Sequence, residues 1–475
     1  MSVEAINEQN IFSNGNPPEI GIGKHNVGSG VLRDSDRQII NKIDAMYGAR
    51  LGHLPNATSR HIALIEKPHQ STTSKMHLEY LSTMYGVRIE QMTAKEVNEL
   101  PGSKLVVPYI YTADVDRVNG PNTRKWGLPR ALVDALKNKA QAHLDMRELQ
   151  THGILPVNFD VTNTDRLTTD TLPFITGVEQ SYDYYGVANK YPVGVMIRPQ
   201  GCDGGYGNAV VEQTQRGIAY TPDGNNERTE YYSSWKAALG AAEGHVRSSS
   251  KDANPEIVVS RFIDVEDSPG MTMFMIDGES HSLGWNGQLM SANGKACVGT
   301  TTFNPISPYS KRMKSEYEDR SAEALANHIH AVAEKHGVNL NGTRGLLNVD
   351  LMIPGEAERL YLERSGQNPN IIYVAEFNPR WTNGSDAAAA VVWATRREHT
   401  AREYMQTVRG GLLAVDKEKV PYRSSEERYD RALRINEDLR EQGSGVILRM
   451  PGQDTIGVIY HGDTQEARRK FLREI

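Results

Sequence analysis

Two short apolar segments each carry a carboxylate where a buried strand is expected. NVDLMI places Asp350 inside an apolar run, and VAEFNPR places Glu376 near the end of another. Burying an unpaired carboxylate costs several kcal/mol, so each acid needs a partner. Asn378 lies two residues beyond Glu376 and therefore shares a strand face with it. If the two strands are neighbours, their carboxylates repel each other unless a cation lies between them.

These oxygen donors indicate a particular metal. Two carboxylates and an amide oxygen suit Mg²⁺, which completes its shell with water and nucleotide phosphates. The alternative for each acid alone is a strand-end residue paired with a nearby lysine or arginine. Arg380 follows on the same face, where it could neutralise phosphate or a developing oxyanion. A structural salt bridge is the alternative for Arg380.

A glycine-rich turn lies between two predicted strands further upstream. Gly201, Gly204, Gly205 and Gly207 fall within seven residues, and the preceding strand YPVGVMIRP carries Arg198. Glycines let backbone N–H groups approach an anion closely. A mobile hairpin tip is the alternative for this turn. Beside a magnesium site, the turn predicts a flap over nucleotide phosphates.

The elements around these motifs predict an α/β protein. HIALIEK and KLVVPYIY read as strands separated by a helix, which favours a small parallel sheet. LPRALVDALKNKAQAHLDMRELQTHG is predicted to be one helix that ends at Gly153. MTMFMIDGESHSLGWNGQLM predicts two strands joined around Asp277-Gly278. The segment SSEERYDRALRINEDLREQ is predicted to be a charged helix whose side chains face the solvent. The alternatives are that this helix covers the active site or forms a dimer contact.

Composition excludes several classes of protein. The chain has 475 residues, 38% of them apolar, and a net charge of -6 that argues against a dedicated nucleic-acid binder. Cys202 and Cys297 cannot form a disulfide framework. No stretch approaches the roughly 18 apolar residues of a membrane span, and the N-terminus lacks the pattern of a signal peptide. We therefore expect a soluble, cytoplasmic protein with no nucleic-acid or membrane partner.

The order of the motifs resembles that of the ATP-grasp enzymes. A lysine opens a helix that leads to Gly-Ile-Leu-Pro (Lys139 to Pro156), and a strand ends in a cation and proline before the glycine loop (VMIRPQGCDGGYGN). A hinge strand then leads into acids (VVSRFIDVED), and NVDLMI and AEFNPR follow. Within that superfamily the chain is similar to the pheganomycin-type peptide ligases, through GYGNA, SPGMTM, NGQLM, GTTTFNP and GVIYHGDTQEA.

The resemblance implies a fold and a division of the chain. The implied fold is α/β, of the α+β ATP-grasp type. The implied parts are a flexible arm (1–35), a pre-ATP-grasp α/β domain (36–125), an ATP-grasp domain (126–409) whose lid covers about 155–265, and a small C-terminal α+β domain (410–475).

The resemblance also implies an ATP-dependent carboxylate–amine ligase. ATP would phosphorylate a carboxylate, and an amine from an amino acid or peptide would displace phosphate to form an amide. Two Mg²⁺ ions are implied, with Mn²⁺ as an alternative, and a homodimer is an alternative to a monomer. The implied site residues are Asp350, Glu376 and Asn378 for metal; Lys139 and Arg198 for the phosphates; Gly204, Gly205 and Gly207 for closure over them; Ser260, Arg261, Phe262 and Ile263 for adenine; Glu266 or Asp267 for ribose; and Arg380, with Arg198, for catalysis.

Three positions depart from the superfamily pattern. Arg198 stands where lysine is usual, Ser260 where glutamate is usual, and Asn348 where related ligases carry an arginine. Arginine can still grip phosphate, in a bidentate geometry. The alternative functions are an ATP-grasp kinase, a carboxylase-like enzyme and a nucleotide-binding module without catalysis.

Overall fold

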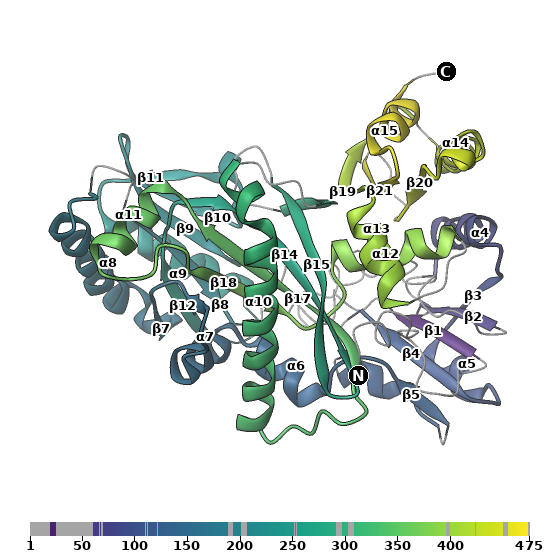
Figure 1. Ribbon diagram of the computed structural model, residues 1–475, viewed down its shortest axis with the longest axis horizontal. Coiled ribbons are helices and arrows are strands. Elements are labelled where there is room, and N and C mark those ends of the chain that lie inside the picture. Colours follow the sequence, from purple (N-terminus) through teal and green to yellow (C-terminus); the bar gives the residue numbers. More distant parts are fainter. Residues whose placement is uncertain are drawn as a thin grey trace.

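The chain folds into three sheets with helices packed against them (Figure 1). The computed structural model describes residues 20–24, 60–65, 67, 70–109, 111, 113–120, 122–188, 193–200, 207–250, 252, 254–290, 297–302, 308–395, 400–422, 424–449 and 455–473.

The N-terminal sheet is parallel throughout, as its alternation of strands and helices predicts. Its strand order is β3-β2-β1-β4-β5. Its elements are β1 (Ile20–Lys24), β2 (Arg60–Leu64), α4 (Thr72–Tyr85), β3 (Ile89–Met92), α5 (Ala94–Glu99), β4 (Lys104–Pro108), the 3-10 helix η3 (Ala113–Arg117) and β5 (Thr123–Lys125). The side chains of Ser71 and Ser74 form a capping box that starts α4, and Gly86 ends it with a φ of 66°.

The predicted flexible arm over residues 1–35 is wrong at one segment. Ile20–Lys24 forms β1, which pairs with both β2 and β4 and so lies at the centre of the sheet. Its sequence IGIGK offers only two apolar residues, too few for a strand to be predicted, but pairing on both sides satisfies its backbone.

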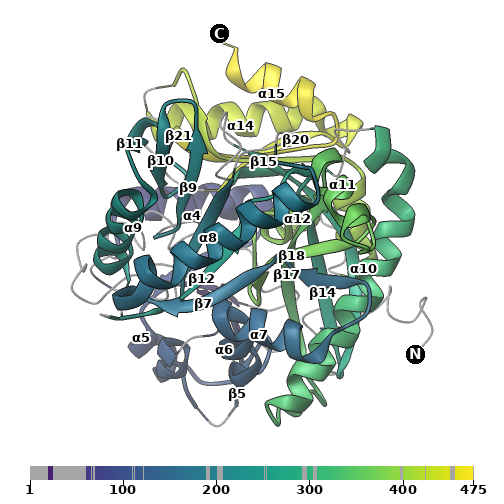
Figure 2. The same cartoon turned by 90° about the vertical axis from the view of Figure 1, so that its left-hand side faces the viewer.

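The predicted lid is a separate antiparallel sheet. Its strand order is β11-β10-β9-β8-β12-β7, with α8 and α9 packed on it. Figure 2 views the molecule from this side, with α8 in front of β7 and β12. The elements are β7 (Phe159–Asn163), η4 (Thr164–Arg166), α8 (Leu167–Tyr184), β8 (Gly194–Pro199), β9 (Ala209–Thr214), β10 (Gly217–Pro222), η5 (Asn226–Arg228), β11 (Glu230–Tyr232), α9 (Trp235–Ser249) and β12 (Glu256–Arg261).

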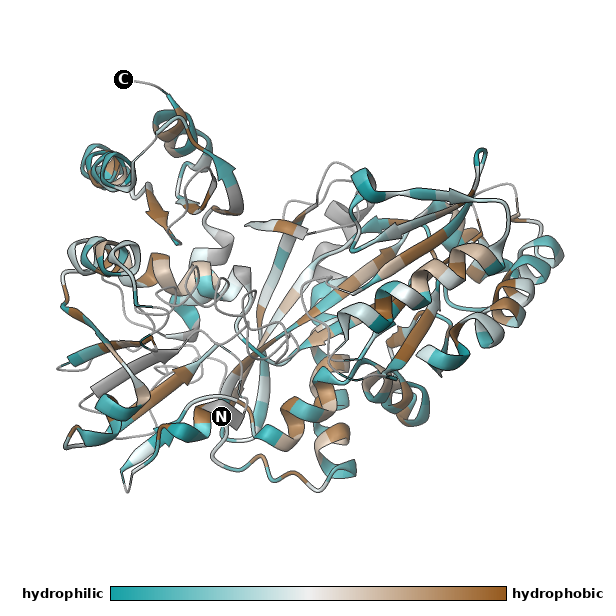
Figure 3. Ribbon diagram, turned by 180° about the vertical axis from the view of Figure 1, so that it is seen from behind, coloured by the Kyte–Doolittle hydropathy of each residue, from teal (hydrophilic) through white to brown (hydrophobic). Residues whose placement is uncertain are grey.

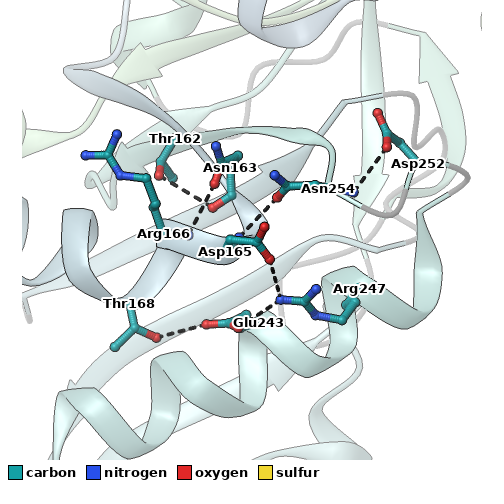
Figure 4. Close-up of polar contacts among 9 residues, drawn as sticks. All are labelled: Thr162, Asn163, Asp165, Arg166, Thr168, Glu243, Arg247, Asp252 and Asn254. Carbon is teal, nitrogen blue, oxygen red and sulfur yellow. Dashed lines mark hydrogen bonds and ion pairs between the residues drawn. The ribbon is translucent and has the colours of Figure 1, made fainter.

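Polar contacts tie the outer edge of the lid together (Figure 4). Arg247 on α9 donates to Asp165 at 2.9 Å and to Glu243 at 3.2 Å, and the backbone N–H of Asp165 donates to the Asn254 side chain. These contacts join α9 to the segments that flank β7 and β12.

The central sheet is the largest, and its strand order is β20-β21-β19-β16-β15-β14-β17-β18-β6, with β13 paired to β17. Its strands are β6 (Ile154–Pro156), β13 (Val265–Asp267), β14 (Gly270–Ile276), β15 (Glu279–Met290), β16 (Cys297–Thr302), β17 (Arg344–Pro354), β18 (Ile372–Asn378), β19 (Leu412–Lys419), β20 (Gly445–Leu448) and β21 (Thr455–His461). The predicted hairpin around Asp277-Gly278 is confirmed, since β14 and β15 pair directly through that turn. Asp277 and Gly278 both have positive φ, of 50° and 91°.

Helices cover the central sheet and join it to the other parts. They are α6 (Arg130–Lys137), α7 (Lys139–Leu149), α10 (Pro308–Lys335), α11 (Glu356–Arg364), α12 (Asn383–Ala394), α13 (Ala401–Arg409), α14 (Ser425–Leu439), η6 (Arg440–Gln442) and α15 (Thr464–Leu472). The single helix predicted to reach Gly153 is wrong, because Asn138 divides it into α6 and α7. The Asn138 side chain accepts a hydrogen bond from the Gln141 N–H and so starts α7 at Lys139.

The C-terminal segment continues the central sheet. β19, which the sequence analysis missed, pairs with β16 on one side and β21 on the other. The charged helix α14 buries Tyr429, Ala432 and Ile435 in a core shared with α4 of the N-terminal part. The C-terminal segment therefore packs against both the N-terminal part and the central sheet and joins the two.

The apolar residues follow this architecture. Figure 3 shows them along the strands and on one side of the helices, with polar residues on the other side. None of the helices in the described part of the chain is both long enough and apolar enough to cross a membrane.

Candidate active site

β17 and β18 bring the predicted metal ligands together. In their antiparallel register Asp350 lies opposite Glu376, and Asn348 lies opposite Asn378. Residues two apart on a strand share a face, so all four side chains belong to one face of the sheet. The register shifts between Asp350 and Leu351, and such bulges can re-aim a side chain beside a site. The predicted pairing of the two strands is confirmed, while the role of these residues as metal ligands stays a prediction.

Three amide groups hold the Asp350 carboxylate. Asn348 Nδ2 and Gln288 Nε2 donate to Oδ1, each at 3.0 Å, and Asn378 Nδ2 donates to Oδ2 at 2.8 Å. Burial and the neighbouring Glu376 carboxylate raise the pKa of Asp350 to about 7, against the opposing effect of Arg380. A divalent cation beside the two carboxylates would favour their charged forms.

The donor set of this face fits Mg²⁺. It consists of two carboxylates and an amide, all with oxygen atoms that a hard cation prefers. Within the described residues, no group of three or more His, Cys, Asp or Glu side chains could hold a metal ion. A cation here would therefore depend on the Asn378 amide, or on water and phosphate oxygens, to complete its shell.

Lys139 approaches the same carboxylates from α7. Its Nζ lies 3.6 Å from Glu376 Oε1, and its side chain is only 4% exposed. The break at Asn138 makes Lys139 the first residue of α7, which is why it can reach β18. The structure therefore places a buried cation beside the predicted metal ligands.

Arg198 on β8 enters the same region from the lid sheet. Its guanidinium is buried, and it donates to the Ala375 carbonyl at 2.5 Å and to the Ser260 hydroxyl at 3.4 Å. Its third partner is His143 Nε2, at 2.9 Å. Because arginine only donates, His143 Nε2 accepts, so Nδ1 carries the proton and donates to the Lys139 carbonyl at 2.8 Å.

His143 makes stability depend on pH. Burial and the adjacent Arg198 lower the pKa of His143 to about 3. The unfolded chain binds this proton near pH 6.5 and the folded chain does not, so stability falls as the pH drops below about 6.5. We expect His143→Gln to flatten the dependence of the unfolding free energy on pH, by up to about 1.4 kcal/mol per pH unit between pH 6 and 4.

Urea titrations at a series of pH values measure this effect. His152→Gln, at an exposed histidine on the same segment, is the matched control and should keep the wild-type slope. An unchanged slope in His143→Gln would show that the folded protein takes up this proton normally.

Arg380 extends the site beyond β18. Its NH2 donates to Asn378 Oδ1 at 2.8 Å, and its NH1 contacts the Tyr109 hydroxyl at 3.3 Å. Tyr109 follows β4, so this contact joins the N-terminal sheet to the face that carries Asp350. The next residue, Trp381, is buried and donates its backbone N–H to the Tyr109 carbonyl.

The hinge, residues 260–263, lies between the lid and the central sheet. Ser260 lies within β12, between β7 and β8, and the N–H groups of Arg261 and Phe262 donate to the carbonyls of Asn158 and Gly194. In the part of the chain that is described, no backbone acceptor takes the Ile263 N–H. This N–H could therefore bind adenine, and adenine binding by residues 260–263 stays a prediction.

Of the two acids predicted to hold ribose, one is already paired. Glu266 forms an ion pair with Arg359 at 2.5 Å. Asp267 lies next to it, and burial and the Glu266 charge raise its pKa. Asp267 Oδ1 accepts the Ser268 N–H at 2.8 Å, and the assignment of the ribose to Glu266 or Asp267 stays a prediction.

The glycine turn is described only at its end. Gly204 and Gly205 lie outside the described residues. Gly207 has a φ of 78°, and its N–H donates to Asp223 at 2.7 Å.

The sequence analysis missed a row of neutral polar side chains beside Asp350. We call Asn286, Thr272, Asn348 and Gln288 the polar row. The Thr272 hydroxyl lies 3.4 Å from both Asn286 Oδ1 and Asn348 Oδ1. At Gly270, opposite Asp350, a Cβ would lie 2.7 Å from the Asn286 amide nitrogen, so a larger residue there would displace the Asn286 side chain. Each strand contributes only one or two of these residues, and the sequence does not show that they lie together.

The sequence and the structure were compared with those of known proteins. No protein-family model and no curated protein matches this sequence. Among solved structures, biotin carboxylase from Campylobacter jejuni in complex with an ATP analogue has a TM-score of 0.50 at 11% identity, over 96% of this chain and 91% of that chain. That protein is an ATP-grasp enzyme. The chain has the ATP-grasp fold.

Two further solved structures are similar. N5-carboxyaminoimidazole synthetase from Staphylococcus aureus, complexed with ADP, has a TM-score of 0.48 at 11% identity, over 98% of this chain and 100% of that chain. Phosphoribosylamine–glycine ligase from Thermotoga maritima has a TM-score of 0.48 at 13% identity, over 95% of this chain and 94% of that chain. The likeness to the biotin carboxylase, at 11% identity, shows the fold alone.

Proposed function

We propose that this protein is an ATP-dependent carboxylate–amine ligase that forms an amide or peptide bond. One observation carries the proposal: the cross-strand pair Asp350 and Glu376, with Asn378 and buried Lys139 beside it, on an ATP-grasp sheet. Two neighbouring carboxylates favour the binding of a divalent cation. That cation and the Lys139 ammonium would together neutralise the phosphates of a nucleotide. The solved neighbours include an ATP-analogue complex and an ADP complex, which supports ATP as the nucleotide.

The nucleotide would lie between the lid and the central sheet. Lys139 and Arg198 would face its phosphates, and the glycine turn that includes Gly207 would close over them. The Ile263 N–H would bind adenine, and Asp267 would accept from a ribose hydroxyl. A closed lid keeps water away from a reactive intermediate.

Asp350, Glu376 and Asn378 would hold Mg²⁺, which neutralises phosphate charge and orients the phosphates when bound. A substrate carboxylate oxygen attacks the γ-phosphorus, the bond to the β-phosphate oxygen breaks, and ADP leaves. The nitrogen of a free amine then attacks the acyl carbon, phosphate leaves with the bonding electron pair, and the nitrogen loses a proton. Arg380 would balance the negative charge that develops in both steps.

The remaining parts of the chain would complete this enzyme. The domain boundaries at residues 126 and 410 stay a proposal, whereas the N-terminal domain starts before residue 36, because β1 belongs to its sheet. This sheet would supply Tyr109 behind Arg380. The substrates would be small molecules, a carboxylate and an amine from an amino acid or a peptide.

Release of ADP from the full chain tests the proposal. We expect ADP to form with Mg²⁺ and ATP only when both a carboxylate and an amine from a panel of amino acids and dipeptides are present. ADP formed from a single acceptor without an amine would instead indicate a kinase. ADP that requires bicarbonate would indicate a carboxylase-like reaction.

A further inference from the structure

A second candidate binding site lies where the N-terminal sheet meets the central sheet. We call it the junction cavity, and its volume is about 360 Å³. It is lined by the end of β5, by the segment that leads into α6, and by the turn that precedes β17. β5 and α6 both lie at the lower edge of the molecule (Figure 1).

The charged residues that line the junction cavity are all cations. They are Arg124, Lys125, Arg130 and Arg344, and no acid lines it among the described residues. Three carboxylates pair with these cations from outside the lining. Asp116 lies 2.5 Å from Lys125, Asp277 lies 3.2 Å from Arg344, and Asp134 lies 3.6 Å from Arg130. These acids are 46%, 45% and 65% exposed, so they meet the cations on the solvent side.

The backbone adds to this positive character. α6 starts at Arg130, and its cap residue, Pro129, makes no side-chain capping bond. The first N–H groups of the helix therefore carry the partial positive charge of a helix N-terminus. Leu128, Pro129 and Arg130 all line the cavity, so the helix begins at its wall. Arginines and a helix N-terminus together are a typical setting for phosphate.

The junction cavity is separate from the candidate active site. Arg344 opens β17, and Asp350 follows six residues later on the same strand. At about 3.3 Å per residue, the two positions are roughly 20 Å apart. Trp126, which lines the cavity, stacks on Trp381 at 5.1 Å between ring centroids, and Trp381 directly follows Arg380.

We propose that the junction cavity binds a small phosphate-bearing molecule, away from the nucleotide. Its volume is at the lower end for small-molecule sites, which suits a compact ligand. The bound phosphate would join β5 and α6 to the turn before β17, and so fix the N-terminal sheet on the central one. The contact from Trp126 to Trp381 would carry this effect toward Arg380. The proposal does not depend on the ligase function.

Calorimetric titration of the full chain with inorganic pyrophosphate, without Mg²⁺, tests the proposal. We expect one site per chain whose affinity falls at least tenfold in the double variant Arg124→Gln/Arg130→Gln. Arg216→Gln, at an exposed arginine on the lid, is the matched control and should bind as the wild type does. Lys139→Met, which alters the nucleotide site, should also bind normally.

Two results would overturn the proposal. One is wild-type affinity in Arg124→Gln/Arg130→Gln, and the other is loss of binding in Lys139→Met alone, which would place pyrophosphate at the nucleotide site. Both side chains of the double variant are at least partly exposed, and a wild-type thermal unfolding curve shows that it folds. Arg344→Gln with Lys125→Gln is a second pair that should give the same tenfold loss.

Discussion

Glu376→Gln should lower ADP formation on the order of 1000-fold while leaving the fold intact. Glutamine has nearly the same shape but removes the charge that faces Asp350 and Lys139 across β17 and β18. Charge stabilisation by a metal contributes several kcal/mol to a transition state, and each 1.4 kcal/mol is about tenfold in rate. The substitution removes the repulsion between Glu376 and Asp350, which adds to the effect of burial on the pKa of Asp350, but it also removes the ion pair with buried Lys139. These two effects on stability oppose each other, so the variant should still fold.

The measurement is steady-state release of ADP over a range of Mg²⁺ concentrations, with thermal unfolding of the same samples. Glu363→Gln, at an exposed glutamate on α11, is the matched control and should have wild-type activity. Turnover near the wild-type rate in Glu376→Gln would remove this residue from the metal site. The ADP-forming reaction itself would then have to be assigned to other residues.

Much of the central site could be predicted because a charged residue inside an apolar run stands out in the sequence and indicates a buried carboxylate with a partner. Asp350 and Glu376 each interrupt an apolar run, and such an acid needs a partner. The two apolar runs are long enough to form strands that pair, and they follow one another closely along the chain. The register that sets Asp350 opposite Glu376 confirms that expectation.

The features that were missed depend on contacts between distant segments. His143 and Arg198 are 55 residues apart, and neither segment shows that the histidine must stay neutral. The polar row takes its side chains from β14, β15 and β17, and each strand contributes only one or two polar residues. β1 has two apolar residues, and only the neighbouring strands on both sides make it a strand. Local patterns cannot report such partners.

A buried ion pair holds the backbone of the hinge in place. The sequence analysis did not predict this pair. Arg261 donates to both oxygens of Glu358, at 2.6 and 2.7 Å, and the two side chains are 3% and 0% exposed. Tyr373 donates to Glu358, and Arg261 donates to the Tyr182 hydroxyl. The pair therefore connects the end of β12 to α11 and α8, and fixes the backbone that leads to Ile263.

Glu358→Ala should lower the free energy of unfolding by about 3–5 kcal/mol, because it leaves Arg261 charged and buried without its carboxylate. The measurement is the shift in the urea midpoint, with Glu356→Ala, an exposed residue on the same helix, as the matched control. The double variant Arg261→Met/Glu358→Leu should recover most of the loss, since apolar side chains of similar volume often replace a buried pair at little cost. A single variant as stable as the wild type would mean that α11 does not hold the hinge. A double variant no more stable than the single one would mean that the hydrogen bonds of the pair with Tyr182 and Tyr373, rather than an unpaired Arg261 charge, account for the loss.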